Sequence, residues 1–173
     1  MTNAQNRVLV AFDSRLGSTA EVAAFIGRVL IDNGQRVDVK AVSQVDNLSP
    51  YNLVLIGGAI RYDRWLPGVT KFTVAHRKTL QQVPVAFFFT CLTLANPTPD
   101  AVRKANSYAQ QIRNLVPEVQ PLSVGQFAGV LRFAGMPWLL RVVLRIVSLA
   151  TGVKEGDYRD WDAIRDWARG QPA

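Results

Sequence analysis

A change of hydrophobic pattern near the N-terminus constrains the fold more than any other feature of the sequence. In residues 7–12, Arg7 is followed by a continuous apolar run with two β-branched valines, which is typical of a parallel strand buried on both faces. From Glu21 to Leu30 the apolar residues instead recur at the spacing of an amphipathic helix. We therefore expect a buried strand, a short polar turn and a helix, which together open an α/β sheet.

The turn carries chemical groups that suit an anion. Ser14, Ser18 and Thr19 supply hydroxyls, Gly17 permits close approach to the backbone, and the first turn of the helix offers free N–H groups. The same residue types often cap a helix without binding a ligand, because a serine or threonine oxygen accepts the same N–H groups. The turn alone leaves both interpretations open.

Strand and helix patterns alternate along the rest of the chain. Alternation of apolar and polar residues predicts an edge or near-edge strand at 37–42. Apolar runs predict further strands, the last of them interrupted, at 51–56, 83–89, 119–124 and 126–131. Helical spacing predicts helices at 18–31, 67–80, 98–115 and 138–149, the first of them ending at Asn33-Gly34. A final helix begins with Asp160 as its cap and Trp161 packed against the sheet. The alternation indicates one α/β domain, residues 1–173, with a doubly wound parallel sheet and a helical insertion at about 132–154.

In a sheet of this kind, ligands bind beyond the carboxyl ends of the strands. The strand at 51–56 is expected to stop at Gly57-Gly58, and aromatic and cationic side chains concentrate in the loop at 59–67. The first turn, this second loop and a third loop at 90–97 would all meet at one edge of the sheet. We expect the ligand site at that meeting point.

Composition narrows the choice of partners and compartment. The 173-residue chain carries a formal charge of +7 and a pI of about 10.1, which favours anionic membranes or acidic small molecules. Basic residues are interspersed with acidic ones over most of the chain, so nucleic acid is not an expected partner. A single cysteine, Cys91, and a polar N-terminus without a signal-peptide core indicate a cytoplasmic protein, either free or peripheral on the inner face of the membrane.

The tract at 132–154 interrupts the expected last helix and is the most polarised part of the chain, because no acidic residue occurs in it. Residues 136–150 include a helical pattern with Arg141 and Arg145 on one stripe and apolar residues over the rest. Such a helix can lie in a membrane interface, contact a lipophilic substrate, cover the core or form a dimer interface. We favour contact with a membrane or a lipophilic substrate.

Several doubly wound families match poorly, because the residues that they require are missing. A dinucleotide-binding fold needs three spaced glycines where this turn has Gly17 alone, and a Walker-type nucleotide site needs a lysine that is absent. A receiver domain would carry an aspartate where Gly57-Gly58 stands. A cysteine phosphatase would carry an arginine soon after Cys91, where Pro97 stands.

The segment Ser14-Arg15-Leu16-Gly17-Ser18-Thr19 resembles the FMN-phosphate signature of flavodoxins, although Leu16 stands where many of them have threonine. This resemblance implies a five-stranded sheet of order 2-1-3-4-5 and FMN as cofactor, with the flavin ring held by the second and third loops. Tyr62 or Trp65 would flank the ring, and the third loop lacks the tyrosine that commonly stacks on it in electron carriers. The implied cofactor-binding residues are Ser14, Arg15, Leu16, Gly17, Ser18, Thr19, Ala59, Ile60, Arg61, Tyr62, Asp63, Trp65, Thr90, Cys91 and Leu92.

Within this family the chain more closely resembles the flavodoxin-type, menaquinone-dependent protoporphyrinogen IX dehydrogenases. The resemblance rests on four segments: Gly17-x-Thr19, Ile60-Arg61-Tyr62, Phe127-Ala128-Gly129 before the basic insertion, and Tyr158-Arg159-Asp160-Trp161. It implies that FMN carries electrons from a reduced tetrapyrrole to a membrane quinone. Arg61, Arg64 and Arg132 are then candidate partners for propionate groups, with no side chain required as acid or base and no metal.

Two other functions stay open from the sequence. A soluble electron-carrier flavodoxin would bind FMN and dock to redox partners, although carriers are usually acidic and this chain is basic. A flavodoxin-like interaction protein without cofactor would be consistent with Leu16 and with the missing tyrosine of the third loop. A homo-oligomer is compatible with each of these functions.

Overall fold

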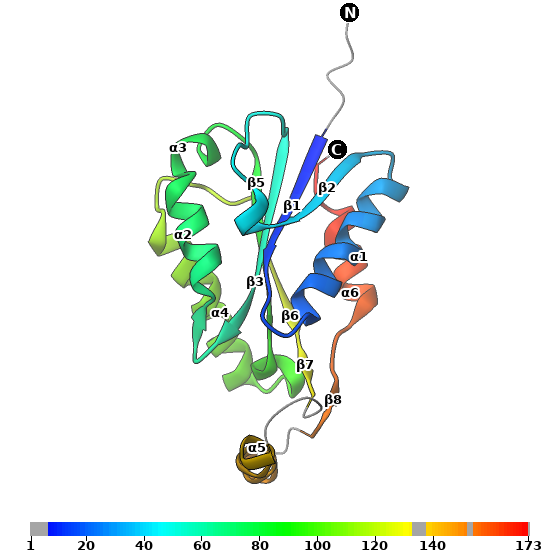
Figure 1. The fold of residues 1–173 in the computed structure, drawn as a ribbon, viewed down its shortest axis with the longest axis vertical. Helices are drawn as coiled ribbons and strands as arrows, with labels where there is room; N and C mark the ends of the chain where they lie inside the picture. Colours follow the sequence, from blue (N-terminus) through cyan, green and yellow to red (C-terminus); the bar gives the residue numbers. More distant parts are fainter. Residues whose placement is uncertain (1–6, 133–137, 152–153, 173) are drawn as a thin grey trace, which may run out of the picture.

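The fold is a parallel sheet between two layers of helices (Figure 1). The computed structural model describes residues 7–132, 138–151 and 154–172. Five parallel strands pair in the order β2-β1-β3-β5-β6, which confirms the order 2-1-3-4-5 expected for the parallel strands. Their bounds are β1 (Arg7–Asp13), β2 (Arg36–Ala41), β3 (Leu53–Arg61), β5 (Val85–Cys91) and β6 (Val124–Ala128), and a short β4 (Arg64–Trp65) pairs antiparallel with β3.

Helices cover both faces of the sheet, so its central strands are apolar throughout. One face packs against α1 (Ser18–Asp32) and α6 (Trp161–Arg169), and the other against α2 (Pro67–Ala75), α3 (Arg77–Leu80) and α4 (Pro99–Leu115). Two short 3₁₀ turns, η1 (Val42–Gln44) and η2 (Leu92–Ala95), follow β2 and β5. In β5, Phe87 and Phe89 are buried on the α4 side, whereas Phe88 is buried on the α1 side.

The predicted ends of two helices are confirmed. Beyond the C-terminus of α1, Gly34 takes the left-handed conformation with φ 84°, which glycine adopts without strain. At the start of α6, the Asp160 carboxylate accepts the backbone N–H groups of Asp162 and Ala163. Both ends follow from local chemistry that the sequence displays directly.

The expectation that the third parallel strand stops at Gly57-Gly58 is wrong, because β3 continues to Arg61. A Cβ atom at Gly57 would lie 2.0 Å from the ring of Phe88, and one at Gly58 would lie 2.6 Å from the side chain of Val69. These two glycines therefore make room for neighbouring side chains instead of forming a turn.

Two further expectations about secondary structure are wrong. The helix predicted at 67–80 divides into α2 and α3 at His76, whose backbone leaves the helical conformation at φ −98° and ψ 9°. The strand predicted at 119–124 is not formed over residues 119–123, and β6 begins at Val124. Pro121 lies in this segment and cannot donate a hydrogen bond to a neighbouring strand.

The tryptophan at the start of α6 packs against the core cluster on the α1 side of the sheet, and its ring contact is with α1. The Trp161 ring packs edge-on against Phe25 of α1, with ring centroids 4.9 Å apart. Trp167, six residues later, packs against the same cluster through the rings of Phe88 and Phe127 in the sheet. Because Trp161 directly follows the cap residue Asp160, it stands at the end of the helix, where α1 is its neighbour.

The insertion leaves the sheet through a narrow neck. β7 (Val130–Leu131) and β8 (Gly156–Asp157) pair antiparallel and bring its two ends together. Figure 1 shows α5 (Trp138–Thr151) beyond the carboxyl ends of the strands, seen end-on and apart from both helical layers. In the three described ranges, no helix is long and apolar enough to cross a membrane.

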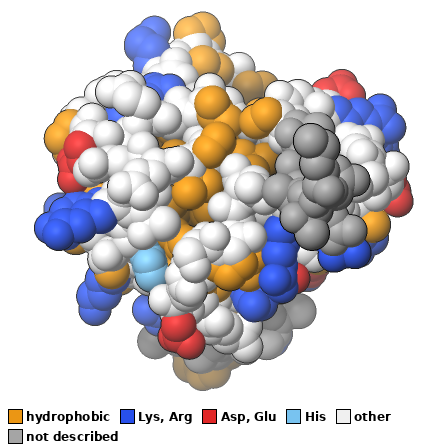
Figure 2. Space-filling model, turned by 90° about the horizontal axis from the view of Figure 1, so that it is seen from above, with side chains coloured by type: hydrophobic (Ala, Val, Ile, Leu, Met, Phe, Trp, Pro, Cys, Tyr) orange, Lys and Arg blue, Asp and Glu red, His pale blue; other side chains and the backbone are white. Residues whose placement is uncertain are grey.

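Figure 2 shows the opposite end of the molecule, where the strands have their amino ends. Apolar side chains form a band near the centre of this face, and lysine and arginine side chains lie around its rim. Leu122 is exposed at this end, just before β6, and its N–H donates to the carbonyl of Val85 at the start of β5. This end therefore offers a reference surface remote from α5.

Candidate functional site

The three loops that the sequence singled out follow neighbouring strands. β1 and β3 pair up to Asp13 and Gly58, and β3 and β5 pair up to Ala59 and Thr90. The first and third loops are also joined directly, because the buried hydroxyls of Thr19 and Thr90 share a hydrogen bond of 2.8 Å. The carboxyl ends of these strands therefore form one edge, as expected for the ligand site of an open α/β sheet.

The first loop leaves the N-terminus of α1 available to an anion. Gly17 is the N-cap at φ 88°, and its own N–H donates to the Ser14 hydroxyl at 3.1 Å. The first intrahelical bond runs from the Glu21 N–H to the Gly17 carbonyl, so the N–H groups of the three residues before Glu21 precede the helical ladder. Within the described residues no side chain caps α1, whereas Thr98 caps α4 and Asp160 caps α6. This difference favours the anion site over simple helix capping.

The side chains of the first loop differ in what they can offer. Arg15 and Leu16 are exposed, and Ser14 and Ser18 are partly buried at the turn. Thr19 is fully buried and its hydroxyl already pairs with Thr90, so its backbone N–H is its more accessible group. Leu16 brings no donor where a threonine would bring one, and the backbone of the loop is unaffected by that difference.

The second loop is a tight hairpin between β3 and β4. Tyr62 and Asp63 form its two-residue turn, and both have positive φ, at 50° and 60°. Such a turn matches the twist of the two strands that it joins, but it is unusual without glycine or asparagine. Tyr62 stands at the tip with 87% of its surface exposed, and the guanidinium of Arg61 lies 5.5 Å from its ring centre. Ala59 and Ile60, the residues of β3 before the turn, are partly buried.

Of the two aromatic residues expected to flank the flavin, Trp65 lies in the core. Its indole N–H donates to the carbonyl of Tyr108 at 2.9 Å, and its ring packs edge-on against Phe87 and Phe89. An indole buried in this way does not present its face to a ligand. Tyr62 is therefore the aromatic side chain that the hairpin presents.

The Asp63 side chain faces α4 and not the sheet edge. Its carboxylate accepts the Tyr108 hydroxyl at 2.6 Å and lies 2.8 Å from the Lys104 ammonium, which together lower the pKa of Asp63. Its backbone carbonyl accepts the Gln111 amide at 2.9 Å. The Tyr108 hydroxyl is also 3.3 Å from the hydroxyl of Thr93 in η2, so this network ties the second loop to the third.

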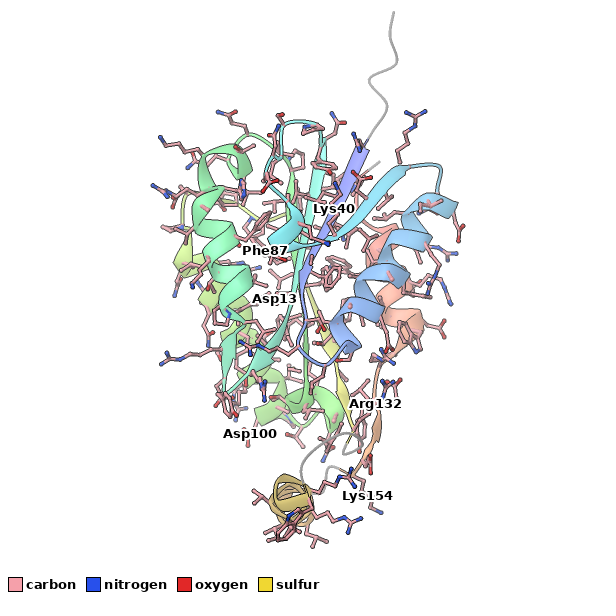
Figure 3. All side chains as sticks on the ribbon, in the orientation of Figure 1. Asp13, Lys40, Phe87, Asp100, Arg132 and Lys154 are labelled. Atoms are coloured by element: carbon pink, nitrogen blue, oxygen red, sulfur yellow. The ribbon has the colours of Figure 1, made fainter. Side chains whose placement is uncertain are left out.

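We expect Asp63→Asn to flatten the acid side of the stability profile. Because the folded-state pKa is lowered, the ionised carboxylate stabilises the protein above about pH 4 and this stabilisation is lost as the pH falls further. The contribution is at most about 1 kcal/mol, because Asp63 is largely exposed. Urea unfolding over a pH series measures it. Asp100→Asn, an exposed site on α4 paired with Arg103, is the charge-matched control (Figure 3), and equal loss of slope in both variants would contradict the assignment.

The third loop begins inside the core. Thr90 and Cys91 are buried at the end of β5, and burial raises the pKa of the Cys91 thiol. The Cys91 carbonyl accepts the Gly129 N–H at 2.9 Å, which joins this loop to the start of the neck. Leu92 is exposed in η2. Backbone groups, and not the thiol, are what this loop can offer to a ligand.

The three arginines expected to hold propionate groups lie on two different elements, the hairpin and the neck. Arg61 and Arg64 are exposed on the hairpin, opposite each other in the register of β3 and β4. Arg132 follows β7 at the neck, and its guanidinium lies 3.5 Å from the carboxylate of Glu21 on α1. Figure 3 shows Arg132 below the sheet, near the insertion. The hairpin and the neck therefore each present an arginine side chain that a substrate carboxylate could meet.

Sequence reasoning missed residues that hold these loops in place. The Asp13 carboxylate accepts the Gly68 N–H at 3.1 Å and so fixes the first turn of α2 against the first loop (Figure 3). The Arg159 side chain is buried between the carboxylates of Glu21 and Asp157 beside α1, a position that the resemblance of its segment does not indicate. An aspartate directly before the anion turn and an arginine beside a cap residue were the signals available.

The donor chemistry of the site fits the phosphate of a flavin mononucleotide. Uncapped N–H groups, the Ser14 and Ser18 hydroxyls and a glycine of positive φ surround the start of α1. A ring held between the other two loops would meet an exposed tyrosine and backbone groups. The arrangement therefore suits a cofactor that brings its own reactivity.

Comparison with known proteins agrees with this chemistry. The chain is 28% identical to protoporphyrinogen IX dehydrogenase (quinone) of Escherichia coli strain K12, over 94% of this chain and 93% of that protein. It is 28% identical to the protein of the same name from Leishmania major, over 97% of this chain and 75% of that one.

Solved structures show the same fold. A short-chain flavodoxin associated with a bacterial microcompartment superposes with a TM-score of 0.59 at 11% identity, covering 95% of both chains. The flavodoxin of Megasphaera elsdenii superposes with a TM-score of 0.54 at 13% identity, covering 69% of this chain and 84% of that one. The sequence profile of the flavodoxin domain matches residues 9–157. The chain therefore belongs to the flavodoxin domain family, and its cofactor is FMN.

Proposed function

We propose that this protein removes electrons and protons from protoporphyrinogen IX and passes them through FMN to a quinone at the membrane surface. The names of the two relatives support both the tetrapyrrole and the quinone. Each pair of hydrogens removed from the macrocycle reduces one quinone to its quinol, so the reaction balances without a further oxidant. The chain would act as one domain on the cytoplasmic face of the membrane.

FMN, when bound, supplies the capacity to accept hydride equivalents from one substrate and to deliver them to another. The protein supplies placement. The N–H groups that begin α1 would hold the phosphate, Tyr62 would flank the ring, and the backbone of Thr90–Leu92 would border its polar edge. Arg61 and Arg64 on the hairpin are the cations that propionate groups would meet, because guanidinium pairs with carboxylate through two parallel hydrogen bonds.

Helix α5 is the observation that carries the proposal. An exposed apolar stripe at helical spacing runs along it through Trp138, Val142, Ile146 and Leu149. Arg141 and Arg145, also exposed, border this stripe. Apolar side chains beside cations suit the interface of an anionic membrane, where quinones are dissolved. Because α5 lies beyond the carboxyl ends of the strands, it would turn the flavin edge toward that surface.

Anaerobic turnover tests the proposal against the second candidate, a soluble electron carrier. With vesicles that contain quinone, the FMN-loaded protein is expected to form protoporphyrin in proportion to the quinol produced. The same protein stripped of FMN is the control and is expected to be inactive. A carrier would bind FMN and exchange electrons with a reductase, yet leave protoporphyrinogen unchanged, and that outcome would rule out the dehydrogenase.

A further inference from the structure

Arg159 is a buried cation that lies outside the three loops expected to hold the flavin. Its side chain is only 3% exposed, in the segment that joins β8 to α6. Two of its nitrogens donate to the Asp157 carboxylate at 2.8 and 2.5 Å, and a third donates to Glu21 at 2.7 Å. Its guanidinium also lies 4.5 Å from the ring centre of Trp161. Buried arginine is costly unless such partners satisfy it, so this position is strongly specified.

The partners of Arg159 connect two parts of the protein. Glu21 lies in the first turn of α1, and the Ser18 carbonyl, 3.4 Å from the same guanidinium nitrogen, belongs to the first residue of that helix. Asp157 belongs to β8, one side of the neck of the insertion. Arg132, on the other side of the neck, also reaches Glu21, at 3.5 Å. Both sides of the neck are thus tied to the turn that offers N–H groups to a phosphate.

The charges of this cluster matter because a phosphate carries negative charge. Hydrogen bonds from Arg159 lower the pKa values of Glu21 and Asp157, so both carboxylates are ionised beside the start of α1. Arg159 and Arg132 offset these two charges. Without Arg159, Asp157 would lose its ion pair and Glu21 would keep only the longer contact with Arg132, so uncompensated negative charge would oppose a phosphate at the helix N-terminus. The first turn of α1 would also lose the hydrogen bonds that Arg159 donates to it.

We propose that Arg159 is a positioning residue for the phosphate of FMN. It fixes the first turn of α1 relative to the neck of the insertion, so that the N–H groups of that turn face the phosphate. It does not itself touch the phosphate in this proposal. The inference rests on FMN being bound with its phosphate at α1, and not on the identity of the substrate or of the electron acceptor.

Comparing FMN with riboflavin isolates this role, because riboflavin has the same ring and lacks the phosphate. Arg159→Gln is expected to weaken FMN binding by roughly tenfold or more, since it removes charge-assisted hydrogen bonds, while riboflavin binding changes little. Arg159→Lys keeps the charge and loses the two-bonded geometry, and we expect an intermediate loss. Flavin fluorescence quenching measures both affinities without turnover, so failure of the proposed dehydrogenase activity would not affect the result.

Arg165→Gln on α6 is the matched control, because Arg165 also pairs with an aspartate, Asp162, and lies over the ring of Phe25. It is expected to leave both affinities unchanged. A second test adds Glu21→Gln to Arg159→Gln. This removes one of the two carboxylates that have lost Arg159 and should recover part of the FMN affinity.

Two outcomes would overturn the inference. If Arg159→Gln loses FMN and riboflavin affinity equally, the role of Arg159 is purely structural. If the FMN affinity of Arg159→Gln is unchanged, Arg159 has no role in binding the cofactor. If Arg159→Gln does not fold, the FMN-to-riboflavin ratio of Arg159→Lys decides in the same way.

Discussion

Replacing Gly17 with alanine is expected to weaken FMN binding by roughly 5- to 30-fold. Gly17 has φ 88°, and an L-residue held in that conformation costs about 1–2 kcal/mol. Among the described residues nothing lies within 4 Å of the added Cβ, so the strain can relax by a shift of the turn. Such a shift would misalign the N–H groups that begin α1, and the strain energy converts into the stated loss of affinity. Titration of the apoprotein with FMN measures it.

Gly34→Ala is the control for Gly17→Ala, because the two glycines share one backbone conformation at opposite ends of α1. Gly34 has φ 84° and also has open space around its Cβ position. Both variants should lose similar stability, since both place alanine in the left-handed region. Only Gly17→Ala should lose FMN affinity. Equal FMN affinity in the two variants would place the phosphate elsewhere.

Removing the apolar stripe of α5 is expected to abolish most vesicle binding and quinone-linked activity. The variant replaces Val142, Ile146 and Leu149, which are exposed, with serine. Each replacement removes about 1 kcal/mol of the free energy gained when the apolar side chain moves from water into the membrane. Together they lower vesicle partitioning roughly a hundredfold. FMN affinity should not change, because α5 lies outside the three loops. Sedimentation with anionic, quinone-loaded vesicles measures binding, and quinol formation measures activity.

Leu122→Ser, at the amino ends of the strands, is the control for this surface and should leave vesicle binding intact. Replacing residues 133–154 with a short glycine–serine linker is the stronger variant, because β7 and β8 already hold the two ends of the insertion together. If vesicle binding and quinone activity both survive that deletion, the role assigned to α5 is wrong.

The sheet could be predicted because its signals are local. Uninterrupted apolar runs such as 8–12 mark strands buried on both faces, and Asp160 and Gly34 mark helix ends through groups that act within one turn. Gly57 and Gly58 misled the prediction because glycine has two uses. Their role depends on Phe88 and Val69, side chains that reach them from other elements, and a local pattern does not contain that information.

The candidate site divides in the same way. The first turn could be identified from its own residues, since hydroxyls, a glycine and a helix start are consecutive in the chain. Trp65 lies in the core and Asp63 faces α4 because both form hydrogen bonds with Tyr108, which is more than forty residues away in the sequence. Arg159 was missed because its partners on α1 are well over a hundred residues distant in sequence. Placement of the cofactor residues around FMN stays a prediction.

The most direct test of the proposed function follows the visible absorbance of the FMN-loaded protein without oxygen. On mixing with protoporphyrinogen IX, the flavin absorbance should bleach while protoporphyrin forms, and it should return when quinone-loaded vesicles are added. In the α5 serine variant, the flavin absorbance should bleach normally, because the variant still binds FMN. The absorbance should return slowly, because the variant no longer binds the vesicles that hold the quinone. An FMN-loaded protein that protoporphyrinogen does not bleach would contradict the central claim.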